Sequence, residues 1–151
     1  MNPVFKKLNF KDQSEILVLN APESFGATLE EMTSFTSVKT QLEHTTQLLF
    51  ALAFVTKQQE VDTLSKQFAE KLADDGLIWF AYPKGSSKRY KCEFNRDNGW
   101  EVLGKEGFEP VRMVAIDEDW SALRFRRTNF IKTMTRSRAL SDEGKERLQK
   151  A

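Results

Sequence analysis

The chain has 151 residues, of which 40% are hydrophobic and 30% charged, with a net charge of +1, one cysteine and one histidine. This length suits a single domain that buries about two thirds of its unfolded surface, and the composition excludes wholesale disorder. One cysteine excludes an internal disulfide and a multi-cysteine zinc site, while the lone His44 leaves little for Ser/His or Cys/His catalysis. No stretch reaches the roughly 18 apolar residues of a membrane helix, and the start MNPVFKKLNFKD lacks a signal-peptide core. We therefore expect a cytoplasmic protein without membrane contact.

The first half of the chain predicts strands separated by one helix. Residues 16–19, ILVL, predict a buried strand that ends at residues 20–22, NAP. Residues 25–32 favour a helix, and residues 36–41 alternate weakly as a second strand does. Residues 48–55, LLFALAFV, are continuously apolar, which is typical of a strand covered on both faces of a parallel sheet.

The next segment predicts the longest helix. Thr56 and Gln59 have capping-box spacing, and Gly76 stands where a left-handed C-terminal cap is expected. Between them, apolar residues recur at helical intervals on one face: Val61, Leu64, Phe68 and Leu72. Residues 77–82, LIWFAY, then predict another buried strand. Strand, helix and strand form a βαβ unit with a right-handed crossover.

The remaining elements predict the end of the sheet. Residues 97–106 favour a short helix ended by Gly107, and residues 110–117 and 120–127 favour an antiparallel hairpin. The order predicts a three-layer Rossmann-like α/β fold, with a mainly parallel sheet and a C-terminal antiparallel hairpin. This layout is similar to the second half of class I methyltransferase folds. We expect one domain over residues 1–127 and a basic extension over residues 128–151.

Charge is distributed unevenly along the chain. Residues 124–151 hold nine Lys or Arg and three Asp or Glu, so this end carries +6 and the rest −5. Such a tail either folds back onto the acidic body, which we favour, or binds an anion.

The candidate site is the loop after the strand at residues 77–82. In an open α/β sheet, ligands gather beyond the carboxyl ends of the strands, where we expect the loops 20–25, 56–58 and 83–96 to meet. The last loop offers cationic, hydroxyl and glycine residues suited to an anion: Lys84, Gly85, Ser86, Ser87, Lys88 and Arg89. It lacks the G-x-x-x-x-G-K-[ST] spacing of a phosphate-wrapping loop, and such residues are also common in any solvated loop.

Other candidate motifs give weaker signals of function. The first turn, LNAPESFG, has no G-x-G-x-x-G fingerprint, so we expect no dinucleotide or methyl-donor cofactor. The acidic run Asp117, Glu118 and Asp119 suits a solvated turn better than a metal site. Arg89 and Lys91 near Cys92 raise the alternative of a reactive thiol with a lowered pKa, although no partnering base is evident. We assign no catalytic residue and no metal ligand.

Three segments carry a family resemblance. LIWFAYPK (residues 77–84), the D-x-x-W form of residues 97–100 and AIDEDWSALRFRR (residues 115–127) resemble a bacterial family described only as a domain of unknown function. The resemblance covers roughly residues 14–127, and the form DEDWSALR (residues 117–124) is its most specific part. It implies a small Rossmann-like domain of bacterial origin and brings no activity.

These observations lead to three functional hypotheses. The first is a non-catalytic module that binds a small anionic ligand or a protein partner, including a second copy of itself. The alternative is an enzyme that acts on a nucleotide-like or phosphorylated small molecule, using Lys84 with a carboxylate such as Asp117 or Glu23. Nucleic-acid binding through the basic tail is a further alternative, which the absence of a known nucleic-acid-binding motif disfavours.

Overall fold

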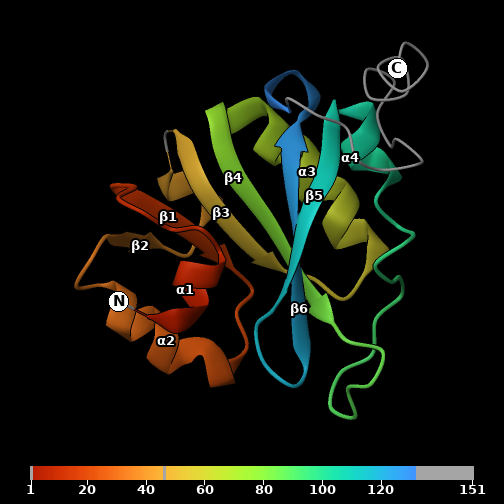
Figure 1. Cartoon of the computed structure of the whole chain (residues 1–151), viewed down its shortest axis with the longest axis horizontal. Helices are drawn as coiled ribbons and strands as arrows, with labels where there is room; N and C mark the ends of the chain where they lie inside the picture. The colour runs from red at the N-terminus through yellow and green to blue at the C-terminus, as the bar shows by residue number, and fades with distance from the viewer. Residues whose placement is uncertain (1, 46, 132–151) are drawn as a thin grey trace.

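A computed structural model describes residues 2–45 and 47–131, which form a six-stranded sheet (Figure 1). The strands are β1 (Glu15–Leu19), β2 (Ser37–Lys39), β3 (Leu48–Phe54), β4 (Leu72–Pro83), β5 (Phe108–Ala115) and β6 (Trp120–Arg127). Their order across the sheet is β2-β1-β3-β4-β6-β5. The first four strands pair in parallel, whereas β6 pairs antiparallel with both β4 and β5. The predicted Rossmann-like α/β fold with a C-terminal hairpin is confirmed.

Helices cover both faces of the sheet, as Figure 1 shows. They are α1 (Pro3–Lys7), α2 (Gly26–Met32), α3 (Gln58–Lys71) and α4 (Glu101–Lys105). Phe68 of α3 and Leu103 of α4 belong to one apolar cluster with Phe80 and Phe125. Phe5 of α1 and Met32 of α2 belong to a second cluster on the other face, with Phe50 and Trp79. Since neighbouring residues of a strand point to opposite faces, β4 contributes Trp79 to one core and Phe80 to the other.

Helix α3 begins one residue later than the predicted capping box. The carboxylate that caps this helix belongs to Glu60, which accepts hydrogen bonds from the backbone N–H groups of Thr56 and Lys57 at 2.9 and 3.0 Å. Glutamate binds these amides more strongly than the neutral Gln59 because its acceptor oxygen is charged. The prediction based on Thr56 and Gln59 was therefore wrong in register.

The predicted left-handed cap at Gly76 was also wrong. The helix ends at Lys71, Gly76 lies within β4, and the positive φ of 40° belongs to Asp74. A Cβ atom on Gly76 would lie 2.6 Å from the Leu72 side chain and 3.1 Å from the Leu48 carbonyl oxygen. Glycine here permits the close approach of β4 to its neighbours, at the irregular start of the β3–β4 pairing.

The short helix α1 was not predicted from the sequence. The Asn2 side-chain oxygen caps it by accepting hydrogen bonds from the N–H groups of Val4 and Phe5, and proline occupies its first position. The indole N–H of Trp79 donates to the Leu8 carbonyl oxygen at 2.9 Å, which fixes this N-terminal segment against the centre of the sheet.

The arginines at the end of β6 bind the body of the domain. Arg126 forms a two-point ion pair with Asp75. Arg127 donates to the carbonyl oxygen of Ala69 in the last turn of α3 and to those of Leu72 and Asp74 beyond its end. Thr128 follows, and its N–H and hydroxyl both donate to the Gly107 carbonyl at 3.0 Å. Most of the predicted basic extension, residues 132–151, lies outside the described residues. Among the described residues, no helix is long and apolar enough to span a membrane.

Candidate ligand-binding site

The loop after β4 is fixed to the β5–β6 connection, and both lie at the same end of the sheet (Figure 1). The Lys84 N–H donates to the Asp119 carbonyl at 2.8 Å, and the Ser87 hydroxyl donates to the Asp119 carboxylate at 2.9 Å. The same Ser87 oxygen accepts hydrogen bonds from the N–H groups of Arg89 and Tyr90. Ser87 therefore uses its only proton to hold the loop.

The acidic run at residues 117–119 shapes a turn. One oxygen of Asp117 accepts hydrogen bonds from the N–H groups of Asp119 and Trp120, at 2.8 and 2.9 Å. This is the local bonding for which turns favour aspartate, as expected from the sequence. Within residues 2–45 and 47–131, no group of three His, Cys, Asp or Glu side chains could hold a metal ion.

The second half of the loop is fixed to the N-terminus of α3. The Glu93 carboxylate accepts a hydrogen bond from the Gln58 N–H at 2.9 Å, and the Glu93 N–H donates to the Thr56 carbonyl at 3.0 Å. The Gln58 side chain in turn donates to the Gly99 carbonyl at 2.7 Å. Glu60 and Glu93 thus supply carboxylates to the first amides of α3, which is where an external anion would otherwise bind.

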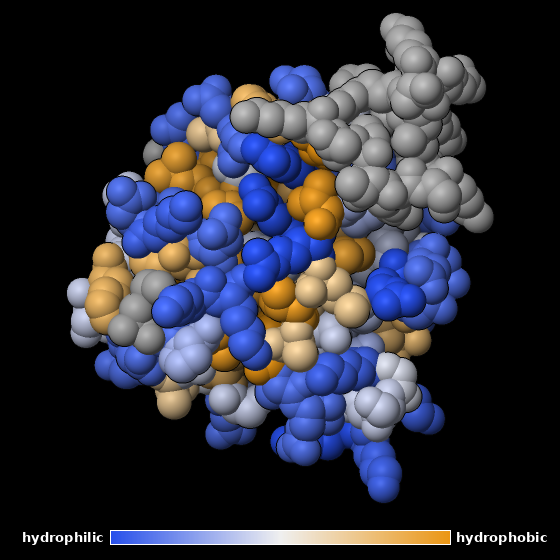
Figure 2. Space-filling view, viewed as in Figure 1, coloured by the Kyte–Doolittle hydropathy of each residue, from blue (hydrophilic) through white to orange (hydrophobic). Residues whose placement is uncertain are grey.

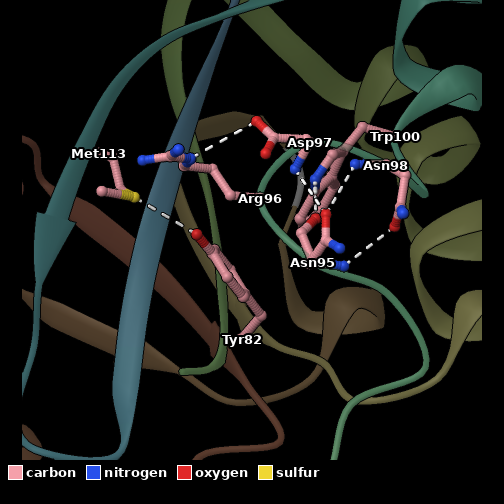
Figure 3. A network of polar contacts seen from close by, with 7 residues as sticks. All are labelled: Tyr82, Asn95, Arg96, Asp97, Asn98, Trp100 and Met113. Carbon is pink, nitrogen blue, oxygen red and sulfur yellow. Dashed lines mark hydrogen bonds and ion pairs between the residues drawn. The ribbon is translucent and has the colours of Figure 1, made fainter. Parts of the chain in front are cut away.

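A tight turn at residues 95–99 presents Arg96 and Asp97 (Figure 3). The Asn95 side-chain oxygen accepts hydrogen bonds from the N–H groups of Asp97 and Asn98, and the Asn98 side chain accepts one from the Asn95 N–H. The indole N–H of Trp100 donates to the Asn95 carbonyl at 2.9 Å. The D-x-x-W form of the sequence is therefore a structural element that positions Arg96 and Asp97.

These constraints leave an open pocket of about 800 Å³ between the loop, the end of β4 and the hairpin. Its lining comes from β4, from the loop and from β5 and β6: Tyr82, Pro83, Lys84, Gly85, Ser87, Tyr90, Lys91, Cys92, Phe94, Asn95, Arg96, Asp97, Met113 and Ser121. Figure 3 shows Tyr82, Arg96, Asp97 and Met113 around part of it. This volume lies within the range of small-molecule sites, about 300–1,000 Å³.

The pocket lining is predominantly cationic. It contains the cations of Lys84, Lys91 and Arg96, but Asp97 is its single carboxylate, and that carboxylate pairs with Arg96 at 3.5 Å. The Tyr82 hydroxyl makes its hydrogen bond to the Met113 sulfur at 3.4 Å, a weak acceptor that a ligand oxygen can replace. Such a lining favours an anion.

Burial alters two titratable groups of the pocket in the same direction. It raises the pKa of the Tyr82 hydroxyl, a group that is protonated at neutral pH even without this shift and can therefore act as a donor. Burial also raises the pKa of the Cys92 thiol, which contradicts the lowered pKa considered from the sequence. Desolvation is the main cause, the charges of Glu93 and Glu60 act in the same direction, and the thiolate needed by a nucleophile is disfavoured.

The predicted site residues divide into two groups. Lys84, Gly85 and Ser87 line the pocket, whereas Ser86, Lys88 and Arg89 are exposed and lie outside its lining. The loop 20–25 does not contribute to the lining either. Three other lining residues, Tyr82, Arg96 and Ser121, were not predicted, because they enter only through the antiparallel pairing of β4 with β6 and the turn at Asn95.

The fold has solved relatives, although no family model and no curated protein matches the chain. A fibrillarin pre-rRNA processing protein from Methanococcus jannaschii is 14% identical over 84% of this chain and 69% of its own, with a TM-score of 0.51. The pyocyanin biosynthetic protein PhzM is 13% identical over 83% of this chain and 53% of its own, with a TM-score of 0.52. The N-methyltransferase NodS from Bradyrhizobium japonicum WM9 matches 83% of this chain and 97% of its own at 17% identity, with a TM-score of 0.47.

The chain has the Rossmann-like fold of class I methyltransferases that use S-adenosylmethionine. It spans about half the length of PhzM. At these identities the similarity establishes the fold and not the reaction. The resemblance to a bacterial domain family remains a prediction.

The residues at the switch point of the sheet do not fit such a cofactor. The strand order reverses between β1 and β3, so a ligand crevice is expected at their carboxyl ends. There the Phe25 and Trp120 rings both pack against Phe54 with centroids 5.0 Å away, and these side chains are 4, 4 and 2% exposed. The turn after β1 also contains Pro22, which has no N–H, and no glycine before Gly26. The chain's own aromatic rings fill the expected crevice.

Proposed function

We propose that the protein binds a nucleotide-like or phosphorylated small molecule in the pocket beyond β4 and acts on it as an enzyme. The observation that carries this proposal is the gathering of Lys84, Lys91 and Arg96 around one pocket with a single carboxylate. Phosphate groups bring the negative charge that such a lining lacks, and the protonated Tyr82 hydroxyl can donate to a phosphate oxygen.

The aromatic side chains favour a ligand with a planar group. Tyr90 and Phe94 line the same pocket. Phe94 is buried, whereas the half-buried Tyr90 ring packs against the Trp120 ring with centroids 4.9 Å apart. A base stacked on a fixed ring gains about 1–3 kcal/mol. A nucleotide satisfies both the cationic and the aromatic parts of the lining.

The test begins with binding. A thermal-shift screen of nucleotides and phosphorylated metabolites, followed by calorimetry of each hit, should find a ligand that stabilises the protein by about 2.7 kcal/mol at 100 times its Kd. Lys84→Ala removes a charge-assisted bond and should weaken binding about tenfold or more. Lys88→Ala is the matched control, because Lys88 belongs to the same loop but lies outside the pocket lining. Equal affinity of the two variants would place the ligand elsewhere.

A second candidate is a non-catalytic binding module. It is favoured by the raised pKa values of Tyr82 and Cys92, which leave both groups in their unreactive protonated forms. Incubating the protein with each ligand that binds, with chromatography of the products, separates the two functions. Turnover that Lys84→Ala reduces supports the enzyme, whereas binding with unchanged ligand supports the module.

A further inference from the structure

Two arginines are direct neighbours across the last two strands of the sheet. Arg112 of β5 and Arg124 of β6 are direct partners in the antiparallel register. Cross-strand partners share a face, and alternate residues of β6 share one too, so both lie on the face of Trp120 and Ala122. That face belongs to the core cluster of α1 and α2, whereas Leu123 and Phe125 face α3 and α4. Figure 2 shows strongly hydrophilic side chains among apolar ones over this part of the sheet.

Like charges directly opposite each other destabilise a strand pair. Two neighbouring carboxylates are already engaged, because Asp75 binds Arg126 in two places, and Asp97, which lines a small hollow with Arg112, pairs with Arg96. Across residues 2–45 and 47–131, no carboxylate forms an ion pair with Arg112 or Arg124. The two guanidinium groups therefore have no ion-pair partner among these residues, and the charge of Arg112 acts on Arg124.

Arg124 also carries an unused hydrogen-bond donor. Its Nε–H is buried and has no hydrogen-bond partner. Burial, helped by the charges of Arg126 and Arg112, lowers the pKa of Arg124, although Asp75 opposes the shift. A buried donor on a charged group costs free energy when it is left unpaired, and a ligand oxygen would recover that cost.

We propose that Arg112 and Arg124 together form a binding site for a phosphate group across β5 and β6. A phosphate carries close to two negative charges and three acceptor oxygens, so one group neutralises both arginines and satisfies the Arg124 Nε–H. A carboxylate would neutralise only one of them. Arg112 also lines a small hollow with Arg96, Asp97 and Met113, which border the pocket beyond β4 as well, so the test must distinguish the two sites. The proposal does not depend on the function proposed for that pocket.

The experiment is a titration of the full chain with inorganic phosphate, against chloride at matched ionic strength, followed by proton–nitrogen NMR. The Nε–H signal of Arg124 and the backbone signals of Arg112 and Arg124 should shift and saturate in phosphate only. Arg112→Gln changes an exposed side chain and should weaken phosphate binding about tenfold. Lys66→Gln removes one exposed positive charge from α3 and should leave the affinity unchanged.

Three results would overturn the proposal: shifts that do not saturate, equal affinity in Arg112→Gln and the wild type, or equal losses in Arg112→Gln and Lys66→Gln. Lys84→Ala separates the two sites, because loss of the Arg124 shift in that variant would place the phosphate in the pocket instead. A nucleoside monophosphate and a single-stranded oligonucleotide then identify the source. Much tighter, steeply salt-dependent binding of the oligonucleotide points to a nucleic-acid backbone, and equal affinity points to a small phosphorylated molecule.

Discussion

The carboxylate of Glu93 accepts a hydrogen bond from the backbone N–H of Gln58 at 2.9 Å, so the loop after β4 caps the helix that precedes β4. Together with the bond from Gln58 to Gly99, this contact fixes the part of the loop whose Cys92, Phe94 and Asn95 line the ligand pocket. The pocket therefore depends on a helix terminus that makes no part of its lining.

Glu93→Ala should destabilise the protein by about 1 kcal/mol, the typical cost of losing a helix cap. This corresponds to a fall in Tm of about 2–4 °C for a domain of this size. Hydrogen exchange should also quicken at the Gln58 amide, which loses its acceptor. Glu118→Ala, at an exposed carboxylate in the β5–β6 turn, is the control and should change neither measurement. Unchanged exchange at Gln58 in Glu93→Ala would show that the contact contributes nothing.

Two glycine substitutions should act in opposite directions. Gly99 has a φ of 93°, and a Cβ atom there would lie 2.5 Å from that of Phe94 and 2.8 Å from the Gln58 side-chain oxygen. Gly99→Ala should therefore cost at least about 1–3 kcal/mol. Gly26 begins α2, and a Cβ atom there meets no other atom within 4 Å, so Gly26→Ala should stabilise by about 0.4–1 kcal/mol. Urea unfolding of both variants tests this pair, and an equal effect of the two would contradict it.

S-adenosylmethionine should not bind at the carboxyl ends of β1 and β3, because Phe25, Phe54 and Trp120 fill that space. We expect no change in Tm at millimolar concentrations of this compound. S-adenosylhomocysteine, tested alongside, should behave in the same way. A saturable shift that Phe25→Leu alters would show that the rings move aside, and the crevice would then be a working cofactor site.

The Cys92 thiol should react slowly with an alkylating reagent in the folded protein. Burial raises its pKa, so less thiolate is present at a given pH than in the unfolded chain. The same shift means that the folded state holds the thiol proton more tightly than the unfolded state does. The protonated thiol therefore makes its full contribution to the free energy of unfolding at neutral pH, and this contribution is lost as the pH rises through the alkaline range. Alkylation rates from pH 7 to 10, with and without urea, test the direction of this pKa shift. Faster alkylation of the folded protein would contradict it.

The strands were predictable because their apolar runs are long and continuous. LLFALAFV and LIWFAY could only be buried strands or a buried helix, and the polar helix between them settled the choice. The errors occurred where one residue decides between alternatives. Glu60 displaced Gln59 as the capping residue because its oxygen is charged, and Gly76 serves strand packing although its spacing suited a helix cap.

The sequence predicted one segment that lines the candidate site but not the distant residues that join it in the fold. The loop after β4 does line a pocket, since Lys84 directly follows a buried strand at the carboxyl edge of the sheet, while anion binding there stays a prediction. Its expected meeting with the loop 20–25 depended on an open crevice, which the packing of Phe25 on Phe54 fills. Arg96 and Ser121 could not have been found, because their positions depend on a turn and on a strand pairing that leave no periodic signal.

The last described strand is an interior strand of the sheet. β6 lies between β4 and β5, so β5 is made earlier but has no neighbour to pair with until residues 120–127 exist. A chain emerging from the ribosome must therefore hold β5 apart from β4 and leave the edge of β4 open to other polypeptides. A chain truncated before Trp120 would lack β6, the strand that joins β5 to β4, and we expect such fragments to aggregate during synthesis.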